Sequence, residues 1–175
     1  MKFHLSIIII LFYLVVSGQE TLQLKKLIYI GGGHASFERS VVGKILEFGY
    51  EYKFDTSFAI NFNYIYAAGE ESIDPNIFTY QNQFNTNFLY SPFDNNRKLD
   101  FRMGIGGSLA HINDKFYEGN NYKNLKKFRF GYNIQFSILT KIYKNIKIGS
   151  KFEIQNYSEN LDVNNTLSLI IGYSL

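Results

Sequence analysis

The stretch SFAINFNYIY, residues 57–66, places apolar and polar side chains at alternate positions. Phe58, Ile60 and Phe62 fall on one side of the repeat, and Asn61 falls on the other. A repeat of two is typical of a β-strand, because successive side chains of a strand point to opposite faces. The stretch therefore predicts a strand with one apolar and one polar face. It leaves open which face points into the molecule.

The same alternation recurs along most of the chain. Seven further segments have strand character and cover roughly 24–33, 42–54, 78–90, 99–111, 128–141, 146–155 and 166–175. Only the first of them gives no clear face. Short connections alternate with longer polar ones, which we expect at 34–42, 69–76, 112–127 and 158–165. This alternation of short and long links indicates one domain of eight strands in an up-and-down meander.

The first residues differ from the rest of the chain. Lys2 and His4 precede an apolar run, Leu5–Val16, in which Ser6 is the one polar residue, and small residues follow at Ser17 and Gly18. This order of basic, apolar and small residues predicts a cleaved secretory signal peptide at residues 1–18, with the barrel domain at 19–175. The apolar run is shorter than the roughly twenty residues of a helical membrane span.

Composition excludes several classes of function. The chain has no cysteine, so it has neither a disulfide framework nor a thiolate metal site. Its formal net charge of +3 gives no indication of a nucleic-acid partner. It has 17 Phe and 14 Tyr residues but no Trp, and this aromatic content falls mainly on the apolar side of the strands.

Three arguments indicate that the apolar face points outward, to lipid. An eight-stranded barrel is just wide enough to be filled by side chains, and so many aromatic rings could not all fit inside it. The rings are expected near both ends of the strands, as in the aromatic girdles of membrane barrels. The strands also have the length of a tilted membrane crossing. The alternative is a soluble, lipocalin-like calyx with an apolar interior.

The sequence resembles the small eight-stranded outer-membrane β-barrels of Gram-negative bacteria, the superfamily of the outer membrane protein A transmembrane domain. The resemblance rests on the leader, on YIGGGH at 29–34, on the 89–111 hairpin and on LSLIIGYSL at 167–175. It implies an all-β, antiparallel transmembrane barrel in the outer membrane. It also implies contact with outer-membrane lipid and lipopolysaccharide, and recognition of the last strand by the barrel-insertion machinery. Members of this class include structural anchors, adhesins, small pores and lipid-modifying enzymes.

The polar faces of the strands carry charges that would point into the lumen. The predicted network consists of Glu47, Glu51, Lys53, Asp100, Arg102, Arg129, Lys147, Lys151 and Glu153, with Lys141 as a further member. Buried charges persist when they are paired, and acids and bases are nearly balanced here. The structural interpretation is therefore a plugged, rigid interior. The functional alternative is a narrow ion path gated by rearrangement of the pairs.

Candidates for catalysis and metal binding are weak. His34, Ser36 and Glu38 follow one another at alternate positions, an arrangement that could serve acyl transfer. Lipid A deacylases of this fold carry their His-x-Ser pair in a late strand, where this chain has Asn156. His34 and His111 are expected on opposite walls of the ring, too far apart to share a metal ion. We therefore predict no catalytic, cofactor-binding or metal-binding residue.

The sequence thus predicts a non-enzymatic outer-membrane barrel with a structural or surface-interaction role through its extracellular loops, whose partner the sequence does not name. The alternatives are a narrow ion-conducting pore and a lipid A-modifying acyl hydrolase of the same fold.

Overall fold

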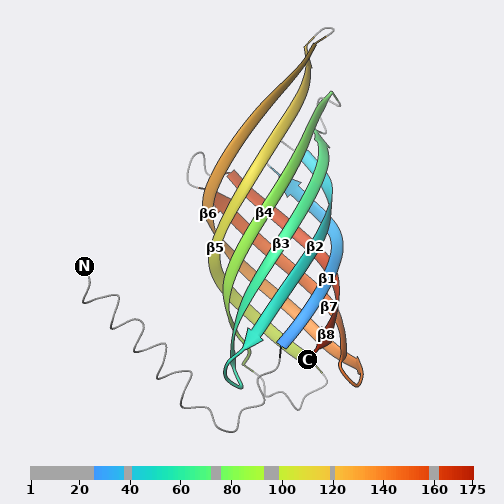
Figure 1. Ribbon diagram of the computed structural model, residues 1–175, viewed down its shortest axis with the longest axis vertical. Coiled ribbons are helices and arrows are strands. Elements are labelled where there is room, and N and C mark those ends of the chain that lie inside the picture. Colours follow the sequence, from blue (N-terminus) through green and yellow to red (C-terminus); the bar gives the residue numbers. More distant parts are fainter. Residues whose placement is uncertain (1–25, 38–40, 72–75, 93–98, 119–120, 158–161) are drawn as a thin grey trace, which may run out of the picture.

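The computed structural model describes residues 26–37, 41–71, 76–92, 99–118, 121–157 and 162–175, so the predicted leader at 1–18 lies outside the described residues. The described residues form eight strands and their turns (Figure 1). The strands are β1 (Lys26–Phe37), β2 (Val41–Lys53), β3 (Phe58–Glu71), β4 (Ile77–Tyr90), β5 (Leu99–Glu118), β6 (Asn121–Tyr143), β7 (Ile146–Tyr157) and β8 (Asp162–Ser174).

The strands pair in chain order, each antiparallel to the next, and close into a barrel. Closure is made by β1 and β8, whose ladder runs from Leu27 opposite Ser174 to Ser36 opposite Asn165. At the end of this ladder the amide of Leu175 donates to the carbonyl of Lys26 at 2.8 Å. The predicted eight-stranded, up-and-down, antiparallel architecture is therefore confirmed. Among the described residues, no helix of the length and apolarity needed to cross a membrane was found.

The apolar sides of the strands face outward. In β3 and β4, Phe62 is 49% exposed and Phe84 is 57% exposed, whereas Asn61 and Asn87 are fully buried. This arrangement places the polar face of the opening stretch in the lumen. In β1, whose facing the sequence did not reveal, the odd-numbered residues point inward and the even-numbered ones point outward.

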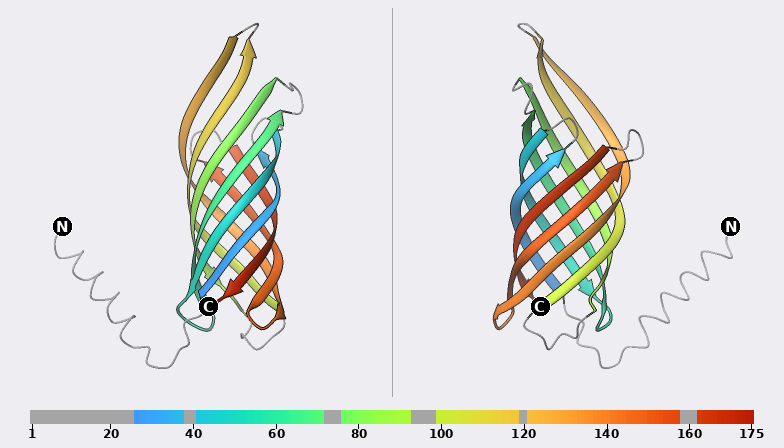
Figure 2. Two further views of the ribbon diagram at one scale, coloured as in Figure 1. Left: turned by 45° about the vertical axis from the view of Figure 1, so that its right-hand side comes forward. Right: turned by 180° about the vertical axis from the view of Figure 1, so that it is seen from behind.

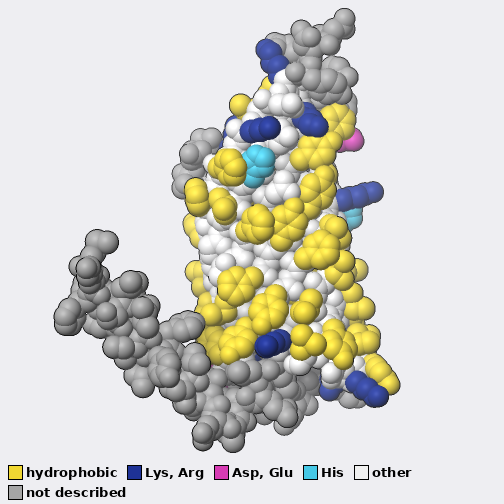
Figure 3. Space-filling view, viewed as in Figure 1, with side chains coloured by type: hydrophobic (Ala, Val, Ile, Leu, Met, Phe, Trp, Pro, Cys, Tyr) yellow, Lys and Arg dark blue, Asp and Glu magenta, His cyan; other side chains and the backbone are white. Residues whose placement is uncertain are grey.

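Hydrophobic side chains gather on the outer surface in an upper and a lower group (Figure 3). The ring of Phe58 lies 5.3–6.4 Å from the rings of Phe54, Phe88 and Tyr90. These residues come from β3, β4 and the short turn between β2 and β3, so the cluster lies at the short-turn end. Such rings favour the interface between lipid and water.

The interior is less polar than we predicted. One buried apolar cluster joins β1, β2 and β3 and consists of Ala35, Phe37, Val41, Ile45, Ile65 and Ala67. A second joins β1, β6 and β8 and consists of Leu27, Tyr29, Leu139 and Ile170. The strand faces near the two barrel ends therefore carry apolar residues on the inside as well. The alternation of polar and apolar residues weakens there, which explains why β1 showed no clear face in the sequence.

The prediction of a surface loop at 112–127 is wrong. β5 continues to Glu118 and β6 begins at Asn121, so most of this segment is a β-hairpin (Figure 2). The upper part of the hairpin rises beyond the other strands, whereas Ile112, Asp114 and Lys127 at its base still line the interior at this end of the barrel. In the upper part both faces can be polar, so the alternation that marks the other strands is absent there. The other three long connections are also shorter than predicted, because their flanking strands extend into them.

Two adjacent glycines in β5 differ in how closely the neighbouring strand approaches them. A Cβ atom on Gly106 would collide with the carbonyl oxygen of Thr86 and would lie 2.8 Å from the Cα of Asn87. A Cβ atom on Gly107 would meet nothing within 4 Å. Only the first position therefore requires glycine for strand packing.

We expect Gly106→Ala to destabilise the barrel by about 1–3 kcal/mol, because the strands must separate to admit the methyl group. The measurement is the urea concentration at which the folded, heat-modifiable band disappears on a gel of the protein in detergent micelles. Gly107→Ala is the matched control and should unfold near the wild-type concentration. Equal behaviour of the two variants would contradict this account of the packing.

Candidate functional site

The centre of the lumen holds a lysine between two carboxylates. Lys151 on β7 contacts Glu47 on β2 across the barrel, and its Nζ lies 3.0 Å from the Oε2 of Glu153. All three side chains are at most 1% exposed. The Asn63 amide donates to Glu47 at 2.9 Å and the Ser168 hydroxyl donates to it at 3.0 Å. This group, which we call the central triad (Glu47, Lys151 and Glu153), is thus enclosed by hydrogen-bond donors.

A second charged group lies at the short-turn end of the lumen. Arg102 contacts Glu51, and its Nε donates to the Oδ2 of Asp100 at 3.0 Å. Lys147 approaches the same carboxylate oxygen at 3.4 Å, and the Ser91 hydroxyl donates to the other oxygen at 2.8 Å. Asp100 therefore receives two cations and a hydroxyl. Lys53 is also buried at this end and lines a small cavity with Glu51 and Arg102.

Amide side chains of β4 close the lumen above the central triad. Gln81 donates to Gln83 at 2.7 Å, and Gln83 donates to Asn85 at 2.8 Å. The hydroxyl of Tyr157 on β7 accepts from Gln81 at 3.3 Å and lies 3.2 Å from the hydroxyl of Ser108 on β5. Because Tyr157 and Gln83 are each only 1% exposed, side chains rather than solvent occupy this level of the barrel.

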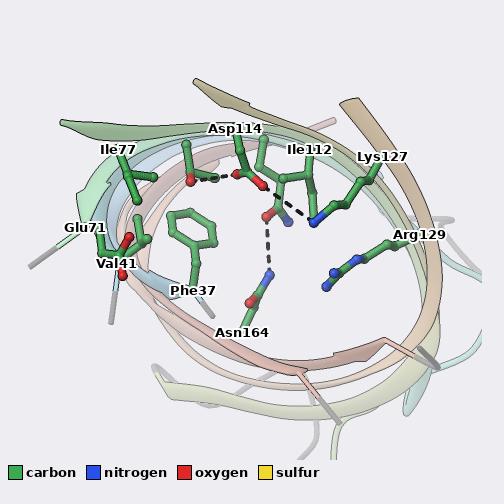
Figure 4. Close-up of a pocket in the computed structure, with 11 residues that line it drawn as sticks. Phe37, Val41, Glu71, Ile77, Ile112, Asp114, Lys127, Arg129 and Asn164 are labelled. Carbon is green, nitrogen blue, oxygen red and sulfur yellow. Dashed lines mark hydrogen bonds and ion pairs between the residues drawn. The ribbon is translucent and has the colours of Figure 1, made fainter. Parts of the chain in front are cut away.

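The end of the lumen opposite the short turns holds a small, partly open cavity of about 30 Å³, which we call the mouth. Figure 4 shows Phe37 on one side of this opening and Arg129 on the other, with Asn164 between them. Val41, Ile77 and Ile112 add apolar surface to the mouth.

Charged and polar pairs complete the mouth. Asp114 accepts from the Thr79 hydroxyl at 2.9 Å and lies 3.8 Å from Lys127. The amide of Asn164 donates to Gln81 at 3.3 Å, which ties the mouth to the layer that closes the lumen. The mouth thus combines an apolar wall with a charged one, and its floor is closed by amides.

The structure separates the predicted charge network into levels. Glu47, Lys151 and Glu153 meet at the centre. Five others gather at the short-turn end, namely Glu51, Lys53, Asp100, Arg102 and Lys147. Arg129 is buried at the opposite end, in the mouth. The expectation that Lys141 joins them is wrong, because this residue is exposed where β6 runs into its turn.

Two tyrosines, which the sequence analysis did not identify as lumen residues, also take part in the interior contacts. The hydroxyl of Tyr29 donates to Glu47 at 3.2 Å, and Tyr157 joins the layer of amides. Tyr157 shares the inward alternation of Glu153 and Gln155, so extending that repeat by two residues would have found it. Tyr29 had no such signal, because β1 shows no polar alternation.

The residues considered for catalysis and metal binding face away from the lumen. His34 and Ser36 are exposed on the outer side of β1, and Glu38 lies outside the described residues. The ring of His111 packs against that of Phe128 at 4.6 Å, and Phe128 is on the outer side of β6. Within the described ranges, no group of three or more His, Asp or Glu residues could hold a metal ion.

We expect Lys151→Met to destabilise the barrel by about 3–5 kcal/mol, because it leaves two buried carboxylates facing each other without a cation. The measurement is urea unfolding in detergent micelles, followed by the heat-modifiable band. Lys141→Met is the matched control, since its side chain is exposed, and should unfold like the wild type. A Lys151→Met protein as stable as that control would show that the triad does not hold the interior together.

The sequence matches no protein-family model and no curated protein sequence, whereas the structure matches known barrels. A major outer membrane protein of Thermus thermophilus superposes with a TM-score of 0.70 at 10% identity, covering 88% of this chain and 100% of that one. Ail of Yersinia pestis, in complex with the heparin analogue sucrose octasulfate, superposes with a TM-score of 0.63 at 12% identity, with the same coverage.

The outer membrane enzyme PagL also superposes, with a TM-score of 0.52 at 12% identity, covering 84% of this chain and 98% of that one. At these identities the matches compare folds rather than activities, and they include both a heparin-analogue complex and an enzyme. The chain therefore has the fold of the small outer-membrane β-barrel proteins.

Proposed function

We propose that this chain is an integral outer-membrane β-barrel protein with a non-enzymatic role, performed by surface contacts at its mouth end. The observation that carries the proposal is the distribution of side chains, which is the reverse of that in a soluble protein. Exposed Phe, Ile, Leu and Tyr side chains surround the barrel, while paired charges and amides fill it. A closed barrel is suited to lipid because each backbone N–H and C=O of the wall is bonded within the protein.

The outer membrane is the proposed location because the matched structures are outer-membrane proteins. Export by the predicted signal peptide at 1–18 fits this location, as does insertion by the barrel-insertion machinery through the last strand. Lys44, exposed on the outer side of β2, would then be available to the phosphates of lipopolysaccharide. The short-turn end would face the periplasm and the mouth would face outward.

The closed interior favours a structural lumen over an ion-conducting pore. An ion would have to pass the layer of Gln81, Gln83 and Tyr157, then the central triad, and displace hydrogen bonds at each level. Eight strands leave no room for a water-filled channel beside these side chains.

The acyl hydrolase alternative has less support. His34 and Ser36 both lie on the outer side of β1. Asn156 occupies the late-strand position where the resemblance would require histidine, and an amide cannot act as a general base. The likeness to the outer membrane enzyme PagL concerns the fold.

The absence of cysteine from the sequence allows a direct test of location and orientation. We expect Lys126→Cys, in the protruding hairpin, to react with a membrane-impermeant maleimide on intact cells. Thr56→Cys, in the short turn between β2 and β3, should react only after the outer membrane is permeabilised. Both positions are exposed, so access to the reagent is the main difference between them.

Each variant is first checked for a heat-modifiable band, which shows that the barrel has formed. Labelling of Thr56→Cys but not Lys126→Cys on intact cells would reverse the proposed orientation. Equal labelling of both variants only after permeabilisation would place the protein in the periplasm, as expected of a soluble calyx.

A further inference from the structure

One strand of the barrel extends well beyond its neighbour on one side. β6 pairs with β5 from Asn121, opposite Glu118, to Thr140, opposite Leu99. Its pairing with β7 begins only at Gly131, opposite Tyr157. Within the described residues, no strand lies on the β7 side of residues Asn124–Phe128, which we call the upper β6 edge (Figure 1).

Such an edge is a template for pairing. In an antiparallel ladder every second residue of a strand directs its N–H and C=O groups to the same neighbour, so alternate residues of the upper β6 edge direct theirs away from β5. Here they point along the barrel wall toward the β7 side, above the last β6–β7 pair at Gly131 and Tyr157. An extended polypeptide laid along the edge could bond to these groups as an additional strand.

The charge around the edge selects the kind of strand that fits. The upper β6 edge contains two lysines, Lys126 and Lys127, and no acidic residue. Arg129, which follows it, is buried in the mouth. Lys126 is exposed, and the Lys127 side chain is 30% exposed beside Asp114. Like charges directly opposite each other destabilise a strand pair, whereas opposite charges stabilise it. Two copies of this edge would therefore repel each other, and an acidic strand would be attracted.

We propose that the upper β6 edge binds an extended, acidic polypeptide segment by strand addition. The main chain of β6 supplies the ladder of hydrogen bonds, and its lysines supply the selection for acidic residues. Leu125 and Phe128, which are 42% and 67% exposed, add apolar contacts on opposite faces of the added strand. This proposal rests on the proposed function, because only an outer-membrane barrel with its mouth outward presents this edge to a partner outside the cell.

A sulfated or phosphorylated saccharide would be attracted by the same lysines. It carries no alternating backbone N–H and C=O groups, so it would leave the ladder of the edge unused. The geometry of the edge therefore favours a polypeptide. The two classes of partner are distinguished by whether binding depends on the hydrogen-bonding capacity of the partner's backbone.

The test measures binding of a fluorescein-labelled peptide of about ten residues that alternates Glu and Thr, a length typical of a long strand. Its partner is the full chain, folded in detergent micelles. A second peptide has the same sequence with every backbone nitrogen methylated, which keeps its charge but removes its donors. We expect the methylated peptide to bind at least about tenfold more weakly than the unmodified one, since main-chain hydrogen bonds provide affinity in strand addition.

A pair of variants then locates the site. Lys126→Glu should weaken binding of the unmodified peptide by about tenfold through like-charge repulsion. Lys141→Glu is the matched control, because it makes the same change of charge at an exposed position at the opposite end of β6. It should bind the peptide like the wild type.

Three results would overturn the proposal: no binding of the unmodified peptide, equal binding of the methylated peptide, or equal weakening by the two substitutions. Sucrose octasulfate, the heparin analogue in the Ail complex, serves as the saccharide probe. The edge is a polyanion site instead if sucrose octasulfate binds, if Lys126→Glu weakens that binding, and if the two peptides bind equally. A protein without a heat-modifiable band would refute the barrel itself, which is a failure of the proposed function and is visible before any peptide is added.

Discussion

The pairing of β1 with β8 is the interaction on which the rest of this structure depends. It joins the first and last strands through ten residue pairs, from Leu27 opposite Ser174 to Ser36 opposite Asn165. Without it the sheet would have two long edges with unbonded N–H and C=O groups, which hydrocarbon cannot solvate. Closure also creates a lumen. Only in this lumen can Glu47, Lys151 and Glu153 be buried away from the apolar outer surface of the wall.

The charged interior costs desolvation free energy and leaves the lumen filled. Burying ions is unfavourable unless each finds a partner and further hydrogen bonds, and the central triad has both. Its members come from strands on different sides of the ring, so the contacts connect walls that the ladders alone would not join. Together with the amides of β4, they fill the lumen. A filled lumen leaves the ends of the barrel as the places where the protein can meet other molecules.

Much of the fold could be predicted because lipid and lumen impose opposite requirements on alternate residues. β3 and β4 satisfy them throughout the wall, so Phe62, Asn61 and their neighbours show the repeat plainly. β1 does not, because Leu27 and Tyr29 point into an apolar part of the interior. The upper part of the β5–β6 hairpin does not show the repeat either, because above the barrel wall neither of its faces has to be apolar. The repeat therefore disappears wherever one of the two environments is missing.

The inward side of most charged residues could also be predicted, but their partners could not. Lys151 meets Glu47, which is 104 residues away, and Arg102 meets Glu51, which is 51 residues away. Such contacts depend on the register of every ladder between the two strands. A shift by two residues keeps the inward facing and changes all the partners. For the same reason, the sequence did not separate Arg129 at the mouth from the pairs at the other end.

The orientation of the apolar face can be measured by fluorescence, because the chain contains no tryptophan of its own. Phe84→Trp would place an indole on the outer side of β4, and Tyr157→Trp would place one in the lumen. In vesicles of brominated phospholipid, we expect emission from Phe84→Trp to be strongly quenched and emission from Tyr157→Trp to remain near its value in unbrominated lipid. Quenching of Tyr157→Trp with unchanged emission from Phe84→Trp would contradict the account, because the apolar face would then lie inside the barrel.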